Sequence, residues 1–409
     1  MNPIGDPWIP VSHEGRYREL SLLEGIRLGD KVSLALSPYE FFPVLRFLLL
    51  VIHRALGRTL FPDTLSLSPE DLARRVEAHL APHAHRFELF SEDFFLSGPS
   101  PHYRLRSLAD LRPDWPSGNN PLLNTPHRAL SPAEVFRSLL VHLHYHPGGT
   151  HAQGISLPGA PLAHGPIAFA ALGPNLHATL LLNLVDAEVE EAPWESLPVE
   201  LSTLDPSGPG RYLIPSRFYR LAPDSLHIAP GPRPGTRGLD PMLAYTREGS
   251  PLFAPKRGFL PGRIFLTWQD LAPPAVLERA EEVALTLGFS YTVVASAQLS
   301  EQARILAFTT SFLPPLTRER LRLGATLSEI GLALEEFLRR LGEERPFTYW
   351  ARLEELLHLD WEAALKEARR EAYRAVNGAL ARQIRRGRDV EKAFAHLKRL
   401  ERTLWTPNA

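Results

Sequence analysis

Apolar residues in the last part of the chain recur at intervals of three or four positions. A stripe from 353 to 384 is followed, after Gly387, by a second stripe from 390 to 404, for which Asp389 is a candidate N-cap. Residues 328–341 have the same spacing, and Pro346 marks a turn after them. These patterns predict three or four antiparallel helices that pack as a bundle.

The earlier part of the chain shows shorter and more varied patterns. Residues 38–56 predict a buried helix. Residues 132–144 predict another, with Ser131 as N-cap and Pro132 at the first helical position. Three short apolar segments are candidate strands, the first two as a pair: 166–172, 178–185 and 263–268.

The distribution of proline divides the chain. Residues 1–300 hold 35 of the 39 prolines, and residues 301–409 hold the other four. Proline lacks a backbone donor and has a fixed φ, so the first part should be loop-rich, whereas the last hundred residues can be almost wholly helical. The sequence therefore predicts an α+β protein, with a mixed, loop-rich α/β domain at 1–316 and a helical bundle at 317–409.

Composition excludes several classes of function. The chain has no cysteine, so disulfides, thiolate metal ligands and cysteine nucleophiles are excluded. The longest strictly apolar run, 47–52, is far shorter than the roughly 20 residues of a membrane-spanning helix. The first residues lack the basic and apolar segments of a secretory signal. We expect a cytoplasmic protein that makes no membrane contact.

Charge is unevenly distributed although it nearly cancels. The 45 Lys and Arg residues face 46 Asp and Glu residues, yet residues 366–402 carry twelve basic residues against five acidic ones. Five arginines there predict a basic stripe on the bundle: Arg369, Arg370, Arg385, Arg386 and Arg388. Such a stripe is either a solvated face or a contact surface for single-stranded DNA or a neighbouring subunit.

The nearest approach to a catalytic cluster is a group of histidines. His142, His144, His146 and His151 lie within ten residues of one another, and helical spacing places only His142 and His146 on one face. Neutral imidazoles bind zinc or manganese, so a metal-dependent nuclease or hydrolase is one interpretation. The other is that cationic histidines complement the dipole at a helix C-terminus. No P-loop, dinucleotide-binding or hydrolase motif is present.

Two polar segments are candidates for binding. The turn-rich stretch 147–161 contains Gly148, Gly149 and Thr150, and glycines let a backbone approach a phosphate or a base edge closely. Lys256 and Arg257 lie in a segment interrupted by glycine and proline. Each has a plainer interpretation, a simple connector for the glycines and solvated charge for the basic pair.

Several local sequences, in order along nearly the whole chain, carry a family resemblance. They are DPWIPV at 6–11, LSLLE at 20–24, the segment 165–185, PWE at 193–195, DPMLAY at 240–245 and the closing stripes from 350 to 405. Together they resemble the CasA family, the large subunit of type I-E CRISPR Cascade.

The resemblance implies a mixed α/β domain followed by a four-helix bundle. It also implies a protein that is not an enzyme, and we expect neither a cofactor nor a metal site, although metal binding by the histidines stays open. The implied function is to check target double-stranded DNA for a short motif beside the target (the PAM), to start strand separation and R-loop formation, and to recruit a helicase-nuclease. The implied partners are the guide RNA and the other Cascade subunits, which are the backbone, guide 5′-end and small subunits.

The resemblance also assigns residues. Asn119, Asn120 and Asn124 match a mobile loop near the guide RNA and the PAM. The glycine-rich minor-groove loop matches Gly148, Gly149 and Thr150, and the cation in the groove matches Lys256 or Arg257. A Gln wedge at a hairpin tip should fall near Val294, Ala295 and Ser296, where no Gln occurs; the nearest is Gln298. The identity of the wedge is thus left open, and so is a purely structural role without DNA contact.

Overall fold

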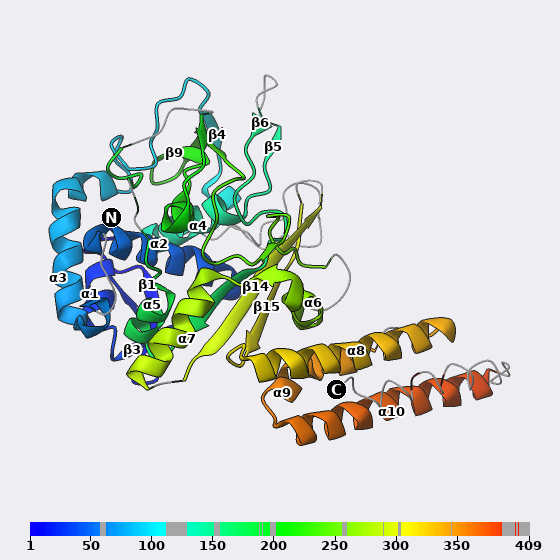
Figure 1. The fold of residues 1–409 in the computed structure, drawn as a ribbon. Helices are drawn as coiled ribbons and strands as arrows, with labels where there is room; N and C mark the ends of the chain where they lie inside the picture. Colours follow the sequence, from blue (N-terminus) through cyan, green and yellow to red (C-terminus); the bar gives the residue numbers. More distant parts are fainter. Residues whose placement is uncertain are drawn as a thin grey trace. The chain divides into compact units, whose positions relative to one another are not determined.

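The computed structural model describes the chain except residues 58–62, 112–128, 151–155, 188, 190, 197–201, 256–259, 289, 302–303, 345, 387–396, 398–399 and 401–409. Its helices and strands are mixed, as the α+β class requires (Figure 1). The chain divides into two compact units. Unit 1 comprises Met1–Ala254 and Ala272–Thr310, and unit 2 comprises Pro255–Leu271 and Ser311–Ala409.

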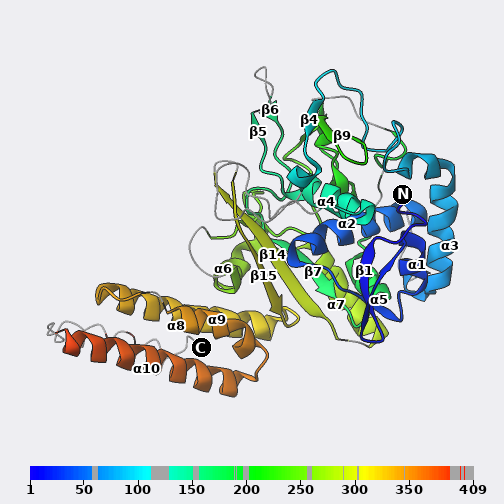
Figure 2. The same cartoon turned by 180° about the vertical axis from the view of Figure 1, so that it is seen from behind.

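The principal sheet of unit 1 joins segments far apart in the sequence. Its strand order is β15-β14-β7, formed by Arg304–Leu313, Thr292–Glu301 and Ala168–Leu172. β14 and β7 are antiparallel, in a register that runs from Thr292↔Leu172 to Ser296↔Ala168. Figures 1 and 2 show α5 and α7 next to this sheet, and both helices contact β7. The strand predicted at 166–172 is confirmed, but its partner is β14.

Smaller sheets and short strands make up the rest of unit 1, except that Leu271 of β13 belongs to unit 2. One sheet has the order β2-β1-β3 and another β4-β10-β9, while β5 pairs with β6 and β11 with β8. Their bounds are β1 Ile9–His13, β2 Arg16–Leu20, β3 Val32–Leu34, β4 Arg104–Arg106, β5 Gly149–Thr150, β6 Ser156–Leu157, β8 Thr203–Leu204, β9 Arg217–Leu221, β10 Leu226–Pro230, β11 Arg233–Pro234, β12 Tyr245–Thr246 and β13 Leu271–Ala272. β14 and β15 are the longest strands in the described part of the chain, with ten residues each. They are longer than the short strands that the proline content predicted.

Two predicted helices are confirmed at the centre of unit 1. Helix α2, Pro38–Leu56, is buried throughout residues 42–53, and α4, Pro132–Tyr145, packs against it. In α4 the Ser131 side chain accepts from the Glu134 N–H, and the Glu134 carboxylate accepts from the Ser131 N–H. This reciprocal cap satisfies two backbone donors that a helix start leaves free. The other helices of unit 1 are α1 Leu22–Arg27, α3 Pro69–Leu80, α5 Leu176–Asn183 and α7 Ala275–Leu287.

The strand predicted at 178–185 is wrong, because the segment forms α5. The Asn175 side chain caps this helix by accepting from the Ala178 N–H at 2.8 Å. At the far end, the Asn183 amide accepts from the Ala171 N–H at 2.9 Å and donates to the Ala171 carbonyl at 2.6 Å. A short apolar run suits either backbone conformation, and here the cap and this clamp on β7 favour the helix.

The strand predicted at 263–268 is also wrong. Helix α6, Leu260–Thr267, occupies most of it and belongs to unit 2, where it packs against α8. The close packing of α6 against its neighbouring helices depends on glycine. A Cβ at Gly324 would stand 2.2 Å from the Phe265 ring, and a Cβ at Gly262 would stand 2.7 Å from Trp350. The apolar face of this segment therefore meets helices rather than a sheet.

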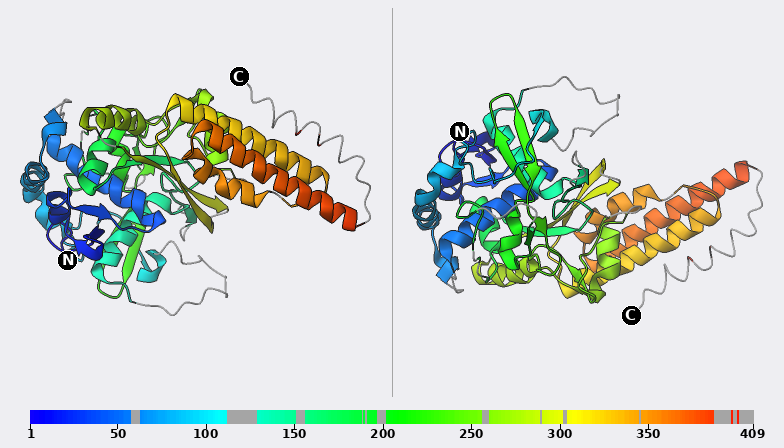
Figure 3. Two further views of the ribbon diagram at one scale, coloured as in Figure 1. Left: turned by 90° about the horizontal axis from the view of Figure 1, so that it is seen from below. Right: turned by 90° about the horizontal axis from the view of Figure 1, so that it is seen from above.

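The other α-helices that the structure describes in unit 2 are α8 Arg318–Arg340, α9 Phe347–Leu357 and α10 Trp361–Arg385. Figure 3 shows α8 and α10 side by side. They run in the same direction, because Arg320 near the start of α8 donates to the Leu357 carbonyl just before α10, and Gln383 near the end of α10 donates to the Leu341 carbonyl just after α8. The helices predicted at 328–341 and 353–384 are confirmed, with a break at Leu359–Asp360.

The structure changes the predicted domain boundary at 317, but it does not test the predicted fourth helix. Unit 2 begins at Ser311 rather than 317 and includes Pro255–Leu271, and β15 interrupts the expected helical content. The stripe predicted at 390–404 lies almost entirely outside the described residues. Among the helices that the structure describes, none has the length and apolarity needed to cross a bilayer.

Candidate nucleic-acid interface

The histidines predicted as a cluster lie at the C-terminal end of α4, and each described one has a partner within the protein. His142 Nδ1 is 2.7 Å from the Tyr219 hydroxyl, and His146 Nδ1 accepts from Arg217 Nη2 at 2.7 Å. The rings of His142 and His146 lie 4.3 Å apart, on one face as the spacing predicted. His144 points elsewhere, with Nε2 2.8 Å from the Tyr212 carbonyl oxygen.

These histidines are neutral, so the prediction that they act as cations at the helix end is wrong. Burial lowers the pKa of His144 to about 4. Burial also lowers the pKa of His142 and of His146 well below the ordinary value, and the neighbouring Arg217 cation lowers both further. No three His, Asp or Glu residues in the described ranges are grouped so as to hold a metal ion, and His151 lies outside those ranges. The described residues therefore give the nuclease interpretation no metal centre.

The glycine loop predicted after α4 begins a short hairpin. Gly149 pairs with Leu157 and Thr150 with Ser156, so that β5 and β6 are antiparallel and lie side by side in Figures 1 and 2. The root of the hairpin is tied to α4, because the Gly148 N–H donates to His146 Nδ1 at 3.2 Å and the Ala160 N–H donates to the His146 carbonyl at 2.9 Å.

The two glycines of this hairpin have different requirements. Gly148 has a φ of +67°, and a Cβ there would stand 3.0 Å from the Gly159 nitrogen, so a side chain is excluded by both conformation and space. A Cβ at Gly149 would meet nothing within 4 Å. Gly148 is therefore required by the fold, while the space beside the Gly149 Cα could hold a side chain.

The wedge position predicted at Ala295 and Ser296 is wrong as a hairpin tip. Both residues are buried in the middle of β14, where Ala295 pairs with Phe169 and the Ser296 hydroxyl donates to the Thr309 carbonyl at 3.1 Å. Gln298 is also fully buried, and its amide donates to the carbonyls of Tyr145 and Ala163. None of these side chains can reach a nucleic acid.

The connection between β14 and β15 lies farther along the chain. β14 ends at Glu301 and β15 begins at Arg304, while Gln302 and Ala303 lie outside the described residues. The sequence signal for this was weak, because β15 is rich in β-branched and aromatic residues, whereas β14 has β-branched residues only at Thr292, Val293 and Val294.

The remaining predicted interface residues lie outside the described residues. These are Asn119, Asn120 and Asn124, together with Lys256 and Arg257. In the predicted basic stripe, Arg386 pairs with Glu343 and Arg370 pairs with Glu367, while Arg388 lies outside the described ranges. Carboxylates of the same unit thus neutralise part of the stripe.

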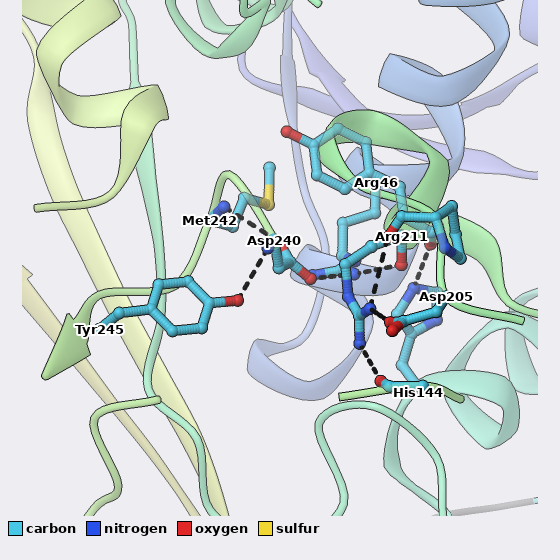
Figure 4. Close-up of polar contacts among 10 residues, drawn as sticks. Arg46, His144, Asp205, Arg211, Asp240, Met242 and Tyr245 are labelled. Atoms are coloured by element: carbon cyan, nitrogen blue, oxygen red, sulfur yellow. Dashed lines mark hydrogen bonds and ion pairs between the residues drawn. The ribbon is translucent and has the colours of Figure 1, made fainter. Parts of the chain in front are cut away.

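Three of the segments that carried the family resemblance contribute to the core of unit 1. The Asp240 carboxylate accepts from Arg46 Nη2 at 2.7 Å and from the Met242 N–H at 3.0 Å, and the Asp240 N–H donates to the Tyr245 hydroxyl (Figure 4). Arg46 and Asp240 are both buried, so the DPMLAY segment is fastened to α2.

Tryptophans from two further segments, DPWIPV and PWE, pack on the same helix. Trp8 and Trp194 are fully buried and contact Phe47 of α2 edge-on, at ring-centroid distances of 5.8 and 6.2 Å. The residues of these family-like segments therefore stabilise the fold. The candidate interface residues lie in loops between such segments.

Comparison with known proteins agrees with the whole-chain resemblance. The sequence model of the family described as CRISPR-associated protein Cse1 matches residues 2–405. A curated relative, CRISPR-associated protein CasA/Cse1 of Thermus thermophilus, is 29% identical over 501 residues, covering 97% of this chain and 97% of the relative.

Solved structures share the fold along the whole length. The chain superimposes on a CRISPR associated protein from Thermus thermophilus with a TM-score of 0.79 at 25% identity, covering 99% of each chain. It matches a structure of Thermus thermophilus CasA (Cse1) with a TM-score of 0.77 at 26% identity, again over 99% of each chain.

Proposed function

The chain belongs to the family of CRISPR-associated protein Cse1, and we propose that it is the large subunit of an RNA-guided CRISPR surveillance complex that reads the PAM of target DNA through the minor groove. The observation that carries the proposal is the β5–β6 hairpin, where the space beside the Gly149 Cα is open and the root requires glycine at position 148. The minor groove presents a degenerate pattern of acceptors plus the guanine amino group, which backbone groups and small polar side chains can read.

The other contacts follow from the resemblance and the corrected strand positions. Lys256 and Arg257 supply the cation that enters the groove, and Asn119, Asn120 and Asn124 contact the guide RNA and the PAM region. Gln302, the next Gln along the chain after Gln298, replaces Ala295 and Ser296 as the wedge in this proposal. Unstacking one base step requires a few kcal/mol, and exchanging duplex for guide–target hybrid is nearly balanced, so a local opening can decide whether R-loop formation begins.

The proposal describes a binding protein rather than an enzyme. Its partners are the guide RNA, target double-stranded DNA, the backbone, guide 5′-end and small subunits, and a helicase-nuclease that this subunit recruits. The layout is an N-terminal domain followed by a four-helix bundle, whose fourth helix is the stripe at 390–404. The cytoplasm is the expected place of action, because guide RNA and target DNA meet there.

The test is a titration of the assembled complex with two duplexes that differ only in the PAM. Gly149→Ala is the decisive variant, since the added methyl meets nothing in the protein and its effect reports on DNA contact. We expect it to reduce the affinity ratio between the two duplexes, and Lys256→Ala/Arg257→Ala to weaken binding by about 1–3 kcal/mol. Complex assembly should be unchanged in both.

Two results would overturn the assignment. One is a Gly149→Ala complex that distinguishes the duplexes as well as the native complex does. The other is a small, salt-sensitive loss that is equal on both duplexes for the double variant, as solvated charges would produce. Gln302→Ala should slow R-loop formation more than it weakens initial binding. Because net charge is −1, the isolated chain should bind DNA weakly and with little PAM preference.

A further inference from the structure

Arg217 of β9 is fully buried, and no carboxylate pairs with it among the described residues. Its Nε and Nη1 atoms have no hydrogen-bond partner there. Burying a guanidinium without a carboxylate is unfavourable, so an arginine at this position needs a compensating interaction. That interaction is the 2.7 Å hydrogen bond from its Nη2 to His146 Nδ1.

His146 is the point where three segments meet. Its Nδ1 accepts from Arg217 and, at 3.2 Å, from the Gly148 N–H. Because both partners are donors, Nδ1 carries no proton and the ring proton is on Nε2. The His146 carbonyl accepts from the Ala160 N–H, so the same residue holds the outgoing and the returning strand of the β5–β6 hairpin. The ring therefore bonds the outgoing root directly, and the backbone carbonyl of the same residue holds the returning root.

We infer that Arg217 is a positioning residue for DNA reading: by holding the His146 ring it fixes the direction in which Gly149 and Thr150 are presented to the minor groove. This inference rests on the proposed function of the hairpin. Arg217 itself is buried and touches no DNA. A groove about 6 Å wide admits the hairpin in few orientations. A loosened root therefore lowers the affinity ratio between the two duplexes even when the protein remains folded.

A neighbouring contact provides a matched control. Tyr219 lies two residues from Arg217 on β9 and bonds to His142, one turn before His146 on α4. This pair also joins the strand to the helix in the interior, but its hydrogen bond does not involve the hairpin root. Tyr219→Phe therefore removes an α4–β9 hydrogen bond while leaving the bonds of His146 in place.

The experiment compares four variants in the assembled complex, each titrated with PAM-bearing and PAM-less duplexes. His146→Leu/Arg217→Met removes the acceptor and the buried cation together, which avoids leaving an unpaired charge. We expect it to reduce the affinity ratio about tenfold, the effect of one lost hydrogen bond. His146→Asn, whose Oδ1 can replace Nδ1 as acceptor, should keep the ratio, and so should Tyr219→Phe. Gly149→Ala tests the hairpin itself.

Hydrogen exchange of the free full-length chain is the second measurement, and it does not depend on assembly. Backbone amides at 147–150 and 156–162 should exchange faster in the double variant and not in Tyr219→Phe. An unchanged exchange rate, or an unchanged affinity ratio in the double variant while Gly149→Ala lowers it, would disprove the role of Arg217 and leave the proposed function intact. If Gly149→Ala also has no effect, the proposed function fails as well.

Discussion

The two units stabilise polar groups in opposite ways. Unit 1 buries them, as with Arg46, Arg217 and His144, each 2% exposed or less. Unit 2 instead pairs its charges between helices or along one helix, with arginines that remain exposed. Glu343 accepts from Arg382 and Arg386, and Glu336 accepts from Arg339 and Arg340.

The difference follows from backbone hydrogen bonding. A helix satisfies its own backbone groups except at its ends, so unit 2 needs side chains mainly for caps and packing. The loops of unit 1 leave carbonyls and N–H groups that buried side chains must satisfy. Arg46, for example, donates to the Arg211 carbonyl at 2.6 Å, and His144 lies 2.8 Å from the Tyr212 carbonyl. Buried polar side chains are the consequence of a loop-rich fold.

Lowering the pH should produce the largest difference in stability between the two units. Burial lowers the pKa of His53 to about 3 and that of His144 to about 4, so the unfolded chain binds protons first as pH falls below about 6.5. Each of these two histidines therefore lowers the free energy of unfolding by about 2 kcal/mol at pH 5. His142 and His146 act in the same direction. Urea unfolding at about pH 7.5 and pH 5, mapped by footprinting mass spectrometry, measures this.

Unit 2 provides the internal comparison. Burial raises the pKa of Glu343, but its hydrogen bonds with Arg382 and Gln383 together leave that pKa below the ordinary value. Its contribution is therefore retained until the pH falls below about 4.5. Equal losses of stability in both units at pH 5 would contradict this account.

Removing one member of the buried ion pair is the next largest change. Arg46→Met leaves the Asp240 carboxylate buried without a cation and should destabilise unit 1 by about 3–5 kcal/mol. Chemical denaturation of the full chain measures it. Arg46→Met/Asp240→Asn, which removes both charges, should recover part of the loss. If Arg46→Met is as stable as the native chain, the ion pair does not contribute to stability.

A core deletion tests where unit 2 ends. Phe265 of α6 is 2% exposed and packs against Gly324 of α8, so Phe265→Ala should destabilise unit 2 by about 3 kcal/mol and leave unit 1 unchanged. Footprinting of the full chain in urea distinguishes the units. For the same reason, a fragment cut at 317 should be helical but less stable than unit 2 in the full chain. Destabilisation of unit 1 alone would assign α6 there instead.

The smallest effects come from two helical glycines of unit 2. A Cβ at Gly331 would stand 2.7 Å from Trp350, so Gly331→Ala should destabilise the unit by about 1–3 kcal/mol. At Gly378 the nearest atom is Arg382 Nη1 at 3.4 Å, so Gly378→Ala should stabilise it by about 0.4–1 kcal/mol. Thermal melting followed at the helical circular-dichroism band compares them, and the same sign for both would refute the packing argument.

Part of the candidate site was accessible from the sequence. Gly148, Gly149 and Thr150 were found because glycines directly after a periodic helix indicate a tight connection. Ala295 and Ser296 were misassigned because local patterns do not tell the middle of a strand from its end. Arg217 gave no signal at all, since its partner His146 is 71 positions away and the two meet only when β9 packs on α4.

Sequence alone determined the elements whose signals are local. The capping pairs and apolar stripes of α2, α4 and α10 depend on residues within a few positions of one another, so they could be read without a fold. Tertiary structure decided the conformation of 178–185 and 263–268, because a short apolar run can be buried as helix or strand and its neighbours choose. It alone also decided which polar groups are buried, because Arg46 meets Asp240 across 194 positions of sequence.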